Sequence, residues 1–242
     1  AACASFLVDY LSDMGLDVTL HETSNHPFVF ATKMLDPALP TLLLYHHYDV
    51  QPVDPIELWD SPPFEPEERE GKIFGRGTGD NKGQAFYTFM ALKAFLEFKG
   101  ISAFNLKIVI EGGEEIGSPG LTDALPKHKE LFKADYLLII DSCMESLAKP
   151  SVALGLRGIV TMDFEIQSAQ IDAHSGLGGV IPNSAKVMTR VLSKLFDDEV
   201  RVLLDGFYDD VEPISEDEKR EIQLIKKLLI VKFKYLYFDI FI

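Results

Sequence analysis

The chain has 242 residues, of which 47% are apolar and 25% charged, as in an ordinary globular protein with enough apolar material for a core. Its 23 basic and 38 acidic residues give a formal net charge of −15, and an acidic surface repels phosphate backbones, which argues against nucleic acid as a partner. Two cysteines, Cys3 and Cys143, are too few for a disulfide framework. With no signal peptide visible, we expect reduced thiols in a cytoplasmic protein, and a chain that starts inside a longer one.

Apolar residues at helical spacing predict two helices in the first 150 residues. The first ends near Met14, with Gly15 as its C-terminal cap. The second covers 82–99, and Asn81 is its expected N-cap. The side chains expected on the buried side of this second helix are Phe86, Phe89, Met90, Ala94 and Phe95.

Apolar runs predict the strands between these helices. The expected strands are 18–20, 28–31, 41–45, 106–110 and 136–140. The last three are compact enough to be buried on both faces, as in a parallel sheet. Strands that alternate with helices predict an α/β fold, with a mostly parallel sheet flanked by helices, over residues 1–150.

A second, smaller α+β domain is expected over residues 151–242. Residues 159–168 alternate like a half-exposed strand, and 183–196 have the pattern of an amphipathic helix. The segment 222–242 is rich in aliphatic and aromatic residues, but four lysines and an aspartate interrupt it. We therefore reject a membrane helix, which needs about 20 mostly apolar residues, and regard the segment as an atypical tail.

Acids and histidines follow three of the predicted buried strands. In open α/β sheets, ligands bind beyond the carboxyl ends of the strands, so these side chains should meet at one edge. Asp80, between a glycine-rich loop and the second helix, should lie at the same edge. The residues after the three strands are His46, His47 and Asp49, then Glu111, Glu114 and Glu115, and finally Asp141.

Carboxylates gathered this closely repel one another, which raises their pKa. Bound divalent cations remove this repulsion. Imidazole with several carboxylates suits Zn²⁺ first, with Mn²⁺ or Co²⁺ as alternatives. Two such ions can share a bridging carboxylate. A single His-x-Asp or Glu-Glu pair is more often a surface feature, and it is the joint placement of these residues after successive strands that predicts the site. The GRGTG segment lacks the spacing of a nucleotide loop.

Four motifs resemble one known family. HYDVQPVDPIELWDSPPFEP (47–66), GRGTGDNKG (75–83), EGGEEIGSPG (111–120) and DAHSGLGG (172–179) are similar to the di-zinc metallopeptidases that include carnosinase and cytosolic nonspecific dipeptidase. Acetylornithine and succinyl-diaminopimelate deacylases are related to them. The resemblance runs from about residue 11 to 214. It implies a zinc-peptidase catalytic domain over 1–150, incomplete here, and a partial lid and dimerisation domain over 151–242.

The resemblance also implies roles for single residues. His47 and Asp141 would bind one metal ion, Asp80 would bridge two ions, and Glu115 would bind the second. Glu114 would be the general base.

Three further features follow from the same resemblance. Asp49 would orient the imidazole of His47. The peptide bond between Asp80 and Asn81 would be cis. His174 would lie in the lid of a homodimer and would stabilise the oxyanion in the partner's active site.

The sequence departs from the family in two places. His46 stands where the family has glycine, and could crowd the site or add a ligand. The segment that returns from the lid, with the last histidine ligand and the substrate-carboxylate groups, is missing after Pro213.

The predicted function is metal-dependent hydrolysis of dipeptides. The alternatives are a non-catalytic remnant, which keeps partial metal binding or dimerisation, and an amino-acid deacylase. The LWDSPPFEP segment favours a dipeptidase.

Overall fold

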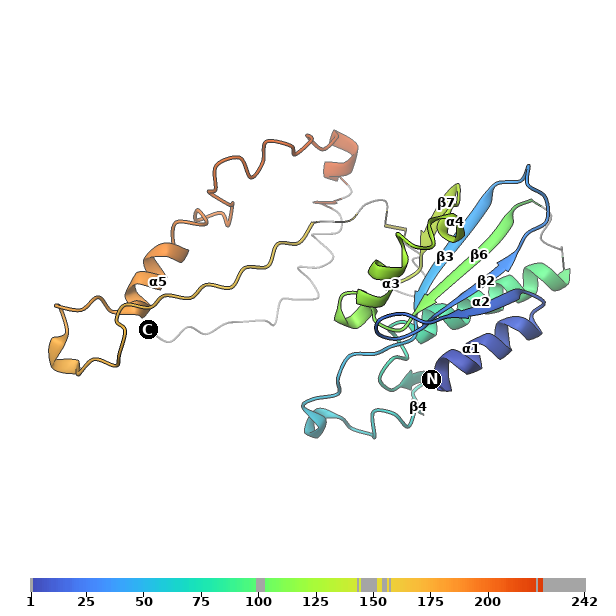
Figure 1. The fold of residues 1–242 in the computed structure, drawn as a ribbon, viewed down its shortest axis with the longest axis horizontal. Helices are drawn as coiled ribbons and strands as arrows, with labels where there is room; N and C mark the ends of the chain where they lie inside the picture. Colours follow the sequence, from blue (N-terminus) through green and yellow to red (C-terminus); the bar gives the residue numbers. More distant parts are fainter. Residues whose placement is uncertain are drawn as a thin grey trace. The chain divides into compact units, whose positions relative to one another are not determined.

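The computed structural model describes residues 2–98, 103–142, 144, 152–153, 156, 158–220 and 222–223. The chain divides into two compact units, Ala1–Leu154 and Gly155–Ile242, which are drawn in Figure 1. The expectations for Cys143 and for the tail beyond residue 223 fall outside the described residues. Within the described part of the chain, no helix has the length and apolar character needed to cross a membrane.

A five-stranded sheet forms the centre of the first unit, in the order β1-β2-β6-β3-β7. The pairs β3/β6 and β3/β7 are parallel, whereas β1/β2 and β2/β6 are antiparallel. The mostly parallel sheet that we expected is therefore mixed. The strands are β1 (Asp17–His21), β2 (Phe28–Lys33), β3 (Thr41–His47), β6 (Asn105–Glu111) and β7 (Tyr136–Ile139).

Connection lengths explain this mixture. The link between β1 and β2 is too short for a crossover, so these strands form an antiparallel hairpin. A long crossover joins β3 to β6 and allows them to run parallel. It contains a 3-10 turn, a small hairpin and a helix: η1 (Ile56–Leu58), β4 (Glu67–Arg69), β5 (Lys72–Phe74) and α2 (Lys82–Phe98).

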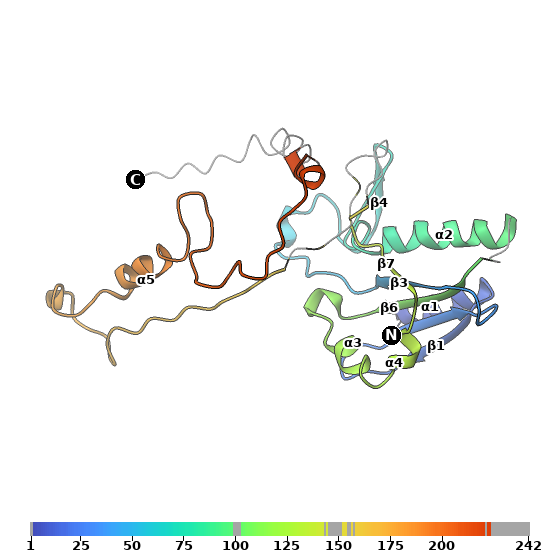
Figure 2. The same cartoon turned by 90° about the horizontal axis from the view of Figure 1, so that it is seen from above.

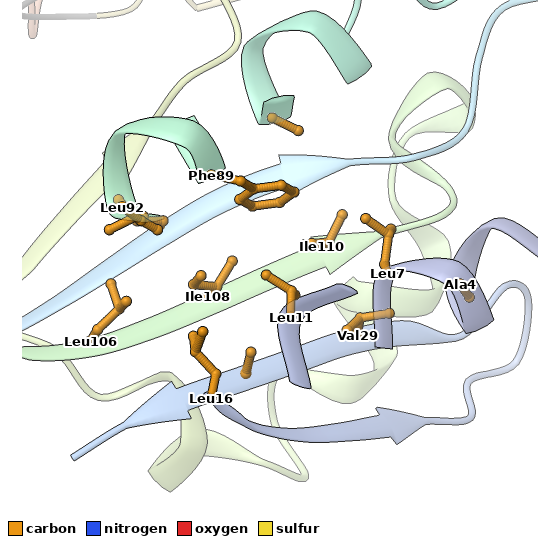
Figure 3. Close-up of a cluster of buried hydrophobic side chains, with 13 residues drawn as sticks. Ala4, Leu7, Leu11, Leu16, Val29, Phe89, Leu92, Leu106, Ile108 and Ile110 are labelled. Carbon is orange, nitrogen blue, oxygen red and sulfur yellow. The ribbon is translucent and has the colours of Figure 1, made fainter. Parts of the chain in front are cut away.

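Helices cover both faces of the sheet, as Figure 2 shows. On one face, α1 (Ala2–Asp13) and α2 pack on alternate residues of the strands, including Val29, Ile108 and Ile110 (Figure 3). On the other face, α3 (Pro119–Ala124) and α4 (Lys129–Phe132) lie over the residues between them, including Phe30, Leu43 and Val109. Because strand side chains alternate between faces, the apolar strands β3 and β6 are buried on both, as expected. The same expectation for 136–140 is wrong, since β7 is at the edge of the sheet and its four residues are exposed.

The buried stripe of α2 differs from our expectation. Phe89 is buried together with Ala85 and Leu92, which lie four residues before it and three after it. The side chains of Phe86, Met90 and Phe95 are 61%, 43% and 52% exposed, and Ala94 is exposed as well. At 3.6 residues per turn, Phe86 and Phe95 lie about 60° and 120° around the helix from Phe89, on opposite sides of it, and the sequence pattern did not distinguish which of these directions meets the sheet.

In the second unit, the regular elements among the described residues are the 3-10 turn η3 (Ser175–Leu177), the helix α5 (Ser184–Leu192) and a short helical stretch at 216–220. Asn183 caps α5, because its side chain accepts a hydrogen bond from the backbone N–H of Lys186 over 3.0 Å. The predicted helix at 183–196 is thus present but shorter. The predicted strand at 159–168 is not formed, since no described segment pairs with it and a strand needs a hydrogen-bonded neighbour.

Candidate metal centre

The predicted site residues of the first unit come together at one edge of the sheet. The strand β3 ends at His47, and β6, its parallel neighbour, ends at Glu111 in register with it. The 3-10 turn η2 (Glu114–Ile116) follows β6, and Asp141 follows β7. Asp80 lies two residues before the start of α2. The carboxyl ends of the parallel strands therefore deliver these groups to one place, as expected for an α/β sheet.

His47 is the centre of the cluster and is almost completely buried. Its Nε2 lies 2.9 Å from Asp80 Oδ1 and 3.7 Å from Asp141 Oδ2. Its other nitrogen, Nδ1, lies 3.2 Å from Asp49 Oδ1. A carboxylate at one imidazole nitrogen fixes the ring and leaves the other free to bind a metal, and Asp49 has the position we expected for it.

Two groups of side chains could each hold a metal ion. One contains His47, Asp80 and Asp141, and the other contains His47, Glu114 and Glu115, with the ligand atoms of each group within 4.8 Å of one another. A buried imidazole surrounded by carboxylates is a donor set that fits Zn²⁺ and related divalent ions. The residues present thus fit the metal that the resemblance implies.

The cluster also changes the pKa of two of its members. Burial by itself would lower the pKa of His47, but Asp141, Asp80 and Asp49 outweigh it and raise that pKa. Burial raises the pKa of Glu114, and the neighbouring carboxylates add to the rise against the opposing effect of His47. A carboxylate with a raised pKa is better suited to accept and return a proton near neutral pH.

Hydrogen bonds hold the turn that carries the two glutamates. Asp49 Oδ1 accepts from the backbone N–H of Glu114 over 3.2 Å, and Oδ2 from that of Glu115 over 2.9 Å. The side-chain amide of Gln51 donates to Glu115 Oε2 over 2.6 Å. Sequence reasoning missed Gln51, although it belongs to the same motif as His47 and Asp49.

A second set of contacts, also missed from the sequence, anchors the other end of this turn. Glu111 is buried, and its Oε1 accepts from the hydroxyl groups of Tyr45 over 2.7 Å and Ser118 over 2.8 Å. Tyr45 and His47 are two positions apart on β3 and so share a face. That spacing is the signal that could have pointed to Tyr45.

Asn81 and His46 behave differently from expectation. The peptide bond between Asp80 and Asn81 is cis, as the resemblance implied. The side chain of Asn81 does not cap α2 but bonds to His46, Ile140 and Asp141. His46 is buried beside Phe89 and belongs to neither ligand group, so it adds no ligand from the described residues.

His174 lies in the second unit, where it is exposed. Its Nδ1 accepts a hydrogen bond from the backbone N–H of Gly176 over 3.0 Å and caps η3. It lines a hollow of about 850 Å³ together with Asp172, Asn183 and Lys186. The local role of the ring is thus structural, and its predicted role in catalysis stays a prediction.

Comparison with known proteins gives a consistent picture. The profile of peptidase family M20/M25/M40 matches residues 43–226. Beta-Ala-His dipeptidase of Homo sapiens is 35% identical over 195 residues, which are 79% of this chain and 38% of that protein. Cysteinylglycine-S-conjugate dipeptidase of Corynebacterium striatum is 34% identical over 206 residues, 84% of this chain and 45% of that protein. The chain thus spans less than half the length of these relatives.

Solved structures agree with these matches. An M20 family metallo-carboxypeptidase, Sso-CP2 from Sulfolobus solfataricus, has a TM-score of 0.79 and 31% identity, covering 99% of this chain and 55% of that one. Human carnosine dipeptidase 1 has a TM-score of 0.67 and 28% identity, covering 97% of this chain and 53% of that one.

Proposed function

The chain belongs to peptidase family M20/M25/M40, and from that premise we propose that it hydrolyses the peptide bond of dipeptides with the help of two divalent metal ions, zinc first among them. The observation that carries this proposal is the arrangement around His47. This one buried imidazole belongs to both groups of candidate ligands, and within each group the ligand atoms lie within 4.8 Å of one another. The names of its relatives, which include dipeptidases for Beta-Ala-His and Cys-Gly, support a small peptide as substrate.

The proposed ligands are drawn from these two groups, and their assignment follows the family resemblance. His47 and Asp141 would hold one ion, Glu115 the other, and Asp80 both. When bound, the ions would polarise a water molecule and offset negative charge on the substrate carbonyl oxygen. Asp49 keeps the imidazole of His47 in place and, through two backbone hydrogen bonds, keeps the turn of Glu115 beside it.

Glu114 is the proposed general base and acid. Its carboxylate takes a proton from the water that attacks the scissile carbonyl, and the carbon–nitrogen bond then breaks. The same carboxyl group returns the proton to the leaving amine, so that Glu114 ends the cycle unprotonated. The raised pKa of this side chain supports the role, because a weakly basic carboxylate would hold the proton poorly.

Two parts of the proposal concern the whole protein. We propose that the second unit serves as a lid through which two copies form a homodimer, and that His174 then stabilises the oxyanion in the partner's site. We also propose that the protein acts in the cytoplasm. The proposed lid and homodimer follow from the family resemblance of the DAHSGLGG segment. The proposed cytoplasmic location follows from the composition, which includes only two cysteines.

The purified chain should be assayed with dipeptides, including Beta-Ala-His and Cys-Gly, and with N-acetylated amino acids, in the presence of Zn²⁺ or Mn²⁺. We expect dipeptide hydrolysis that Glu114→Gln lowers by about 10²–10⁴-fold, with metal binding retained. Glu165→Gln, at an exposed position outside the four family motifs, is the matched control.

Two other results would replace this proposal. Hydrolysis of the N-acetylated compounds alone would identify a deacylase. Metal binding without turnover of any substrate would identify a non-catalytic chain.

A further inference from the structure

His46 is a fully buried histidine that the proposed reaction does not use. It follows Tyr45 and precedes His47 on β3, so its side chain points to the opposite face of the sheet from theirs. There its ring meets Phe89 of α2 edge-on, with the ring centres 5.7 Å apart. Figure 3 shows Phe89 within the apolar cluster on this face. A leucine would satisfy such a position without burying any polar atom.

One nitrogen of His46 has a clear partner. His46 Nδ1 lies 2.9 Å from Asn81 Oδ1. The Nδ2 group of Asn81 donates to two acceptors, the backbone carbonyl of Ile140 and Asp141 Oδ1, each over 2.8 Å. These two bonds determine which end of the Asn81 amide is the acceptor. His46 must therefore carry its proton on Nδ1 and donate it to Asn81.

The other nitrogen has no partner among the described residues. His46 Nε2 is buried and makes no hydrogen bond. Burying an unpaired polar atom is unfavourable, and an apolar side chain would avoid that cost. The contact through Nδ1 is the one feature of the position that an apolar residue could not reproduce.

That contact leads to the candidate metal centre. Asp141 Oδ1 accepts from Asn81, while Asp141 Oδ2 lies 3.7 Å from His47 Nε2. The orientation of the Asp141 carboxylate thus depends on Asn81, and the orientation of Asn81 depends on His46. We propose that His46 is a positioning residue, which holds Asn81 so that Asp141 presents Oδ2 to the metal. The inference rests on the proposed function, because Asp141 is a ligand only there.

Two substitutions separate the donor from the bulk of the ring. His46→Leu fills the space but donates no hydrogen bond. In His46→Asn, the side-chain amide can place an N–H near the position of Nδ1 and so restores the donor. We expect Zn²⁺ to bind about 10–100-fold more weakly to His46→Leu than to the native chain, the loss that follows when the hydrogen-bond partner of a metal ligand, here Asn81, is displaced. His46→Asn should recover most of the loss. Titration against a chromophoric chelator measures these affinities without any turnover.

The metal-free protein supplies a second readout. Long-range ¹H–¹⁵N spectra of the native chain in EDTA should show His46 as the tautomer with its proton on Nδ1. Thermal unfolding in EDTA should show similar stability for His46→Leu and the native chain, because the variant removes the unpaired Nε2 but leaves the buried Asn81 Oδ1 without its donor. A merely structural histidine would lose stability on this substitution and leave the Zn²⁺ affinity unchanged.

The outcomes distinguish this inference from the proposed function. Equal Zn²⁺ affinity in the native chain and His46→Leu overturns the inference and leaves the metal centre intact. A proton on Nε2 of His46 overturns it as well. A native chain that binds no Zn²⁺ contradicts the metal centre itself, and the inference with it.

Discussion

The carboxylate of Asp49 accepts a hydrogen bond from the backbone N–H of Glu115 over 2.9 Å, although the two residues are 66 positions apart in the chain. The other oxygen of Asp49 faces His47 Nδ1 and the backbone N–H of Glu114. One side chain therefore connects the end of β3 to the turn after β6. It orients a ring that belongs to both candidate ligand groups, and it also sets where the two glutamates stand relative to that ring.

Replacing Asp49 by asparagine should weaken metal binding. The amide has a single acceptor oxygen and no charge, so it cannot serve both backbone N–H groups and the imidazole as the carboxylate does. We expect Zn²⁺ affinity to fall about 10–100-fold, measured by calorimetric titration. Asp60→Asn, at an exposed position, should bind as the native chain does. Unchanged affinity in Asp49→Asn would show that the imidazole needs no such partner.

The face of α2 that meets the sheet can be tested with two phenylalanines three residues apart. Phe89 is 4% exposed and Phe86 is 61% exposed. Phe89→Ala should lower the free energy of unfolding by about 3–5 kcal/mol, because a large buried side chain leaves a cavity. Phe86→Ala should change it by no more than about 0.5 kcal/mol. Urea unfolding followed by circular dichroism measures both, and equal losses would contradict this orientation of α2.

The two glycines before η2 should differ sharply in their tolerance of a methyl group. A Cβ added at Gly112 would overlap the ring of Tyr48, whereas the nearest atom to a Cβ at Gly113 is Pro119 Cδ at 3.7 Å. Tyr48 cannot move freely, since its hydroxyl donates to the carbonyl of Pro27 over 2.7 Å.

We therefore expect Gly112→Ala to cost about 1–3 kcal/mol of stability and to weaken metal binding by shifting the turn of the two glutamates. Gly113→Ala is the matched control and should leave both nearly unchanged. Thermal unfolding and metal titration of the two variants measure these effects. Unchanged stability and metal affinity in Gly112→Ala would mean that Tyr48 can move away from this position.

His21 should make the fold less stable in acid. Burial, and then the neighbouring charge of His128, lower the pKa of His21 below its ordinary value of 6.5. At a pH below 6.5, the unfolded chain thus binds a proton that the folded chain resists, and the free energy of unfolding falls as the pH falls. The contribution is fully present above 6.5.

Urea unfolding at several pH values between 5 and 8 measures this effect. His21→Phe keeps a ring to stack on Phe28, where the ring centres are 4.7 Å apart, but removes the titration. We expect a shallower loss of stability in acid for this variant than for the native chain. A slope in His21→Phe equal to that of the native chain would assign the acid sensitivity to other groups.

The sequence by itself determined the five strands of the central sheet and where the polar residues follow them. The runs at 41–45 and 106–110 are the cores of β3 (Thr41–His47) and β6 (Asn105–Glu111). A short uninterrupted apolar run between turns is typical of a strand in a sheet that is covered on both faces. The positions of His47, Asp80 and Asp141 at one edge follow from that arrangement. The long motifs also identified the family, which the profile match confirms.

The tertiary structure decided the features that depend on what lies across a contact. The local pattern of apolar residues does not predict three such features. They are the antiparallel pairing of β1 and β2, the face of α2 that is buried, and the partners of Asn81. A pattern of apolar residues sets how often a side chain returns to a face, but not which face meets the sheet. Likewise, an asparagine before a helix can cap it or bond to a neighbour. The buried ring of His46 and the carboxylate of Asp141, both distant in sequence, favoured the second.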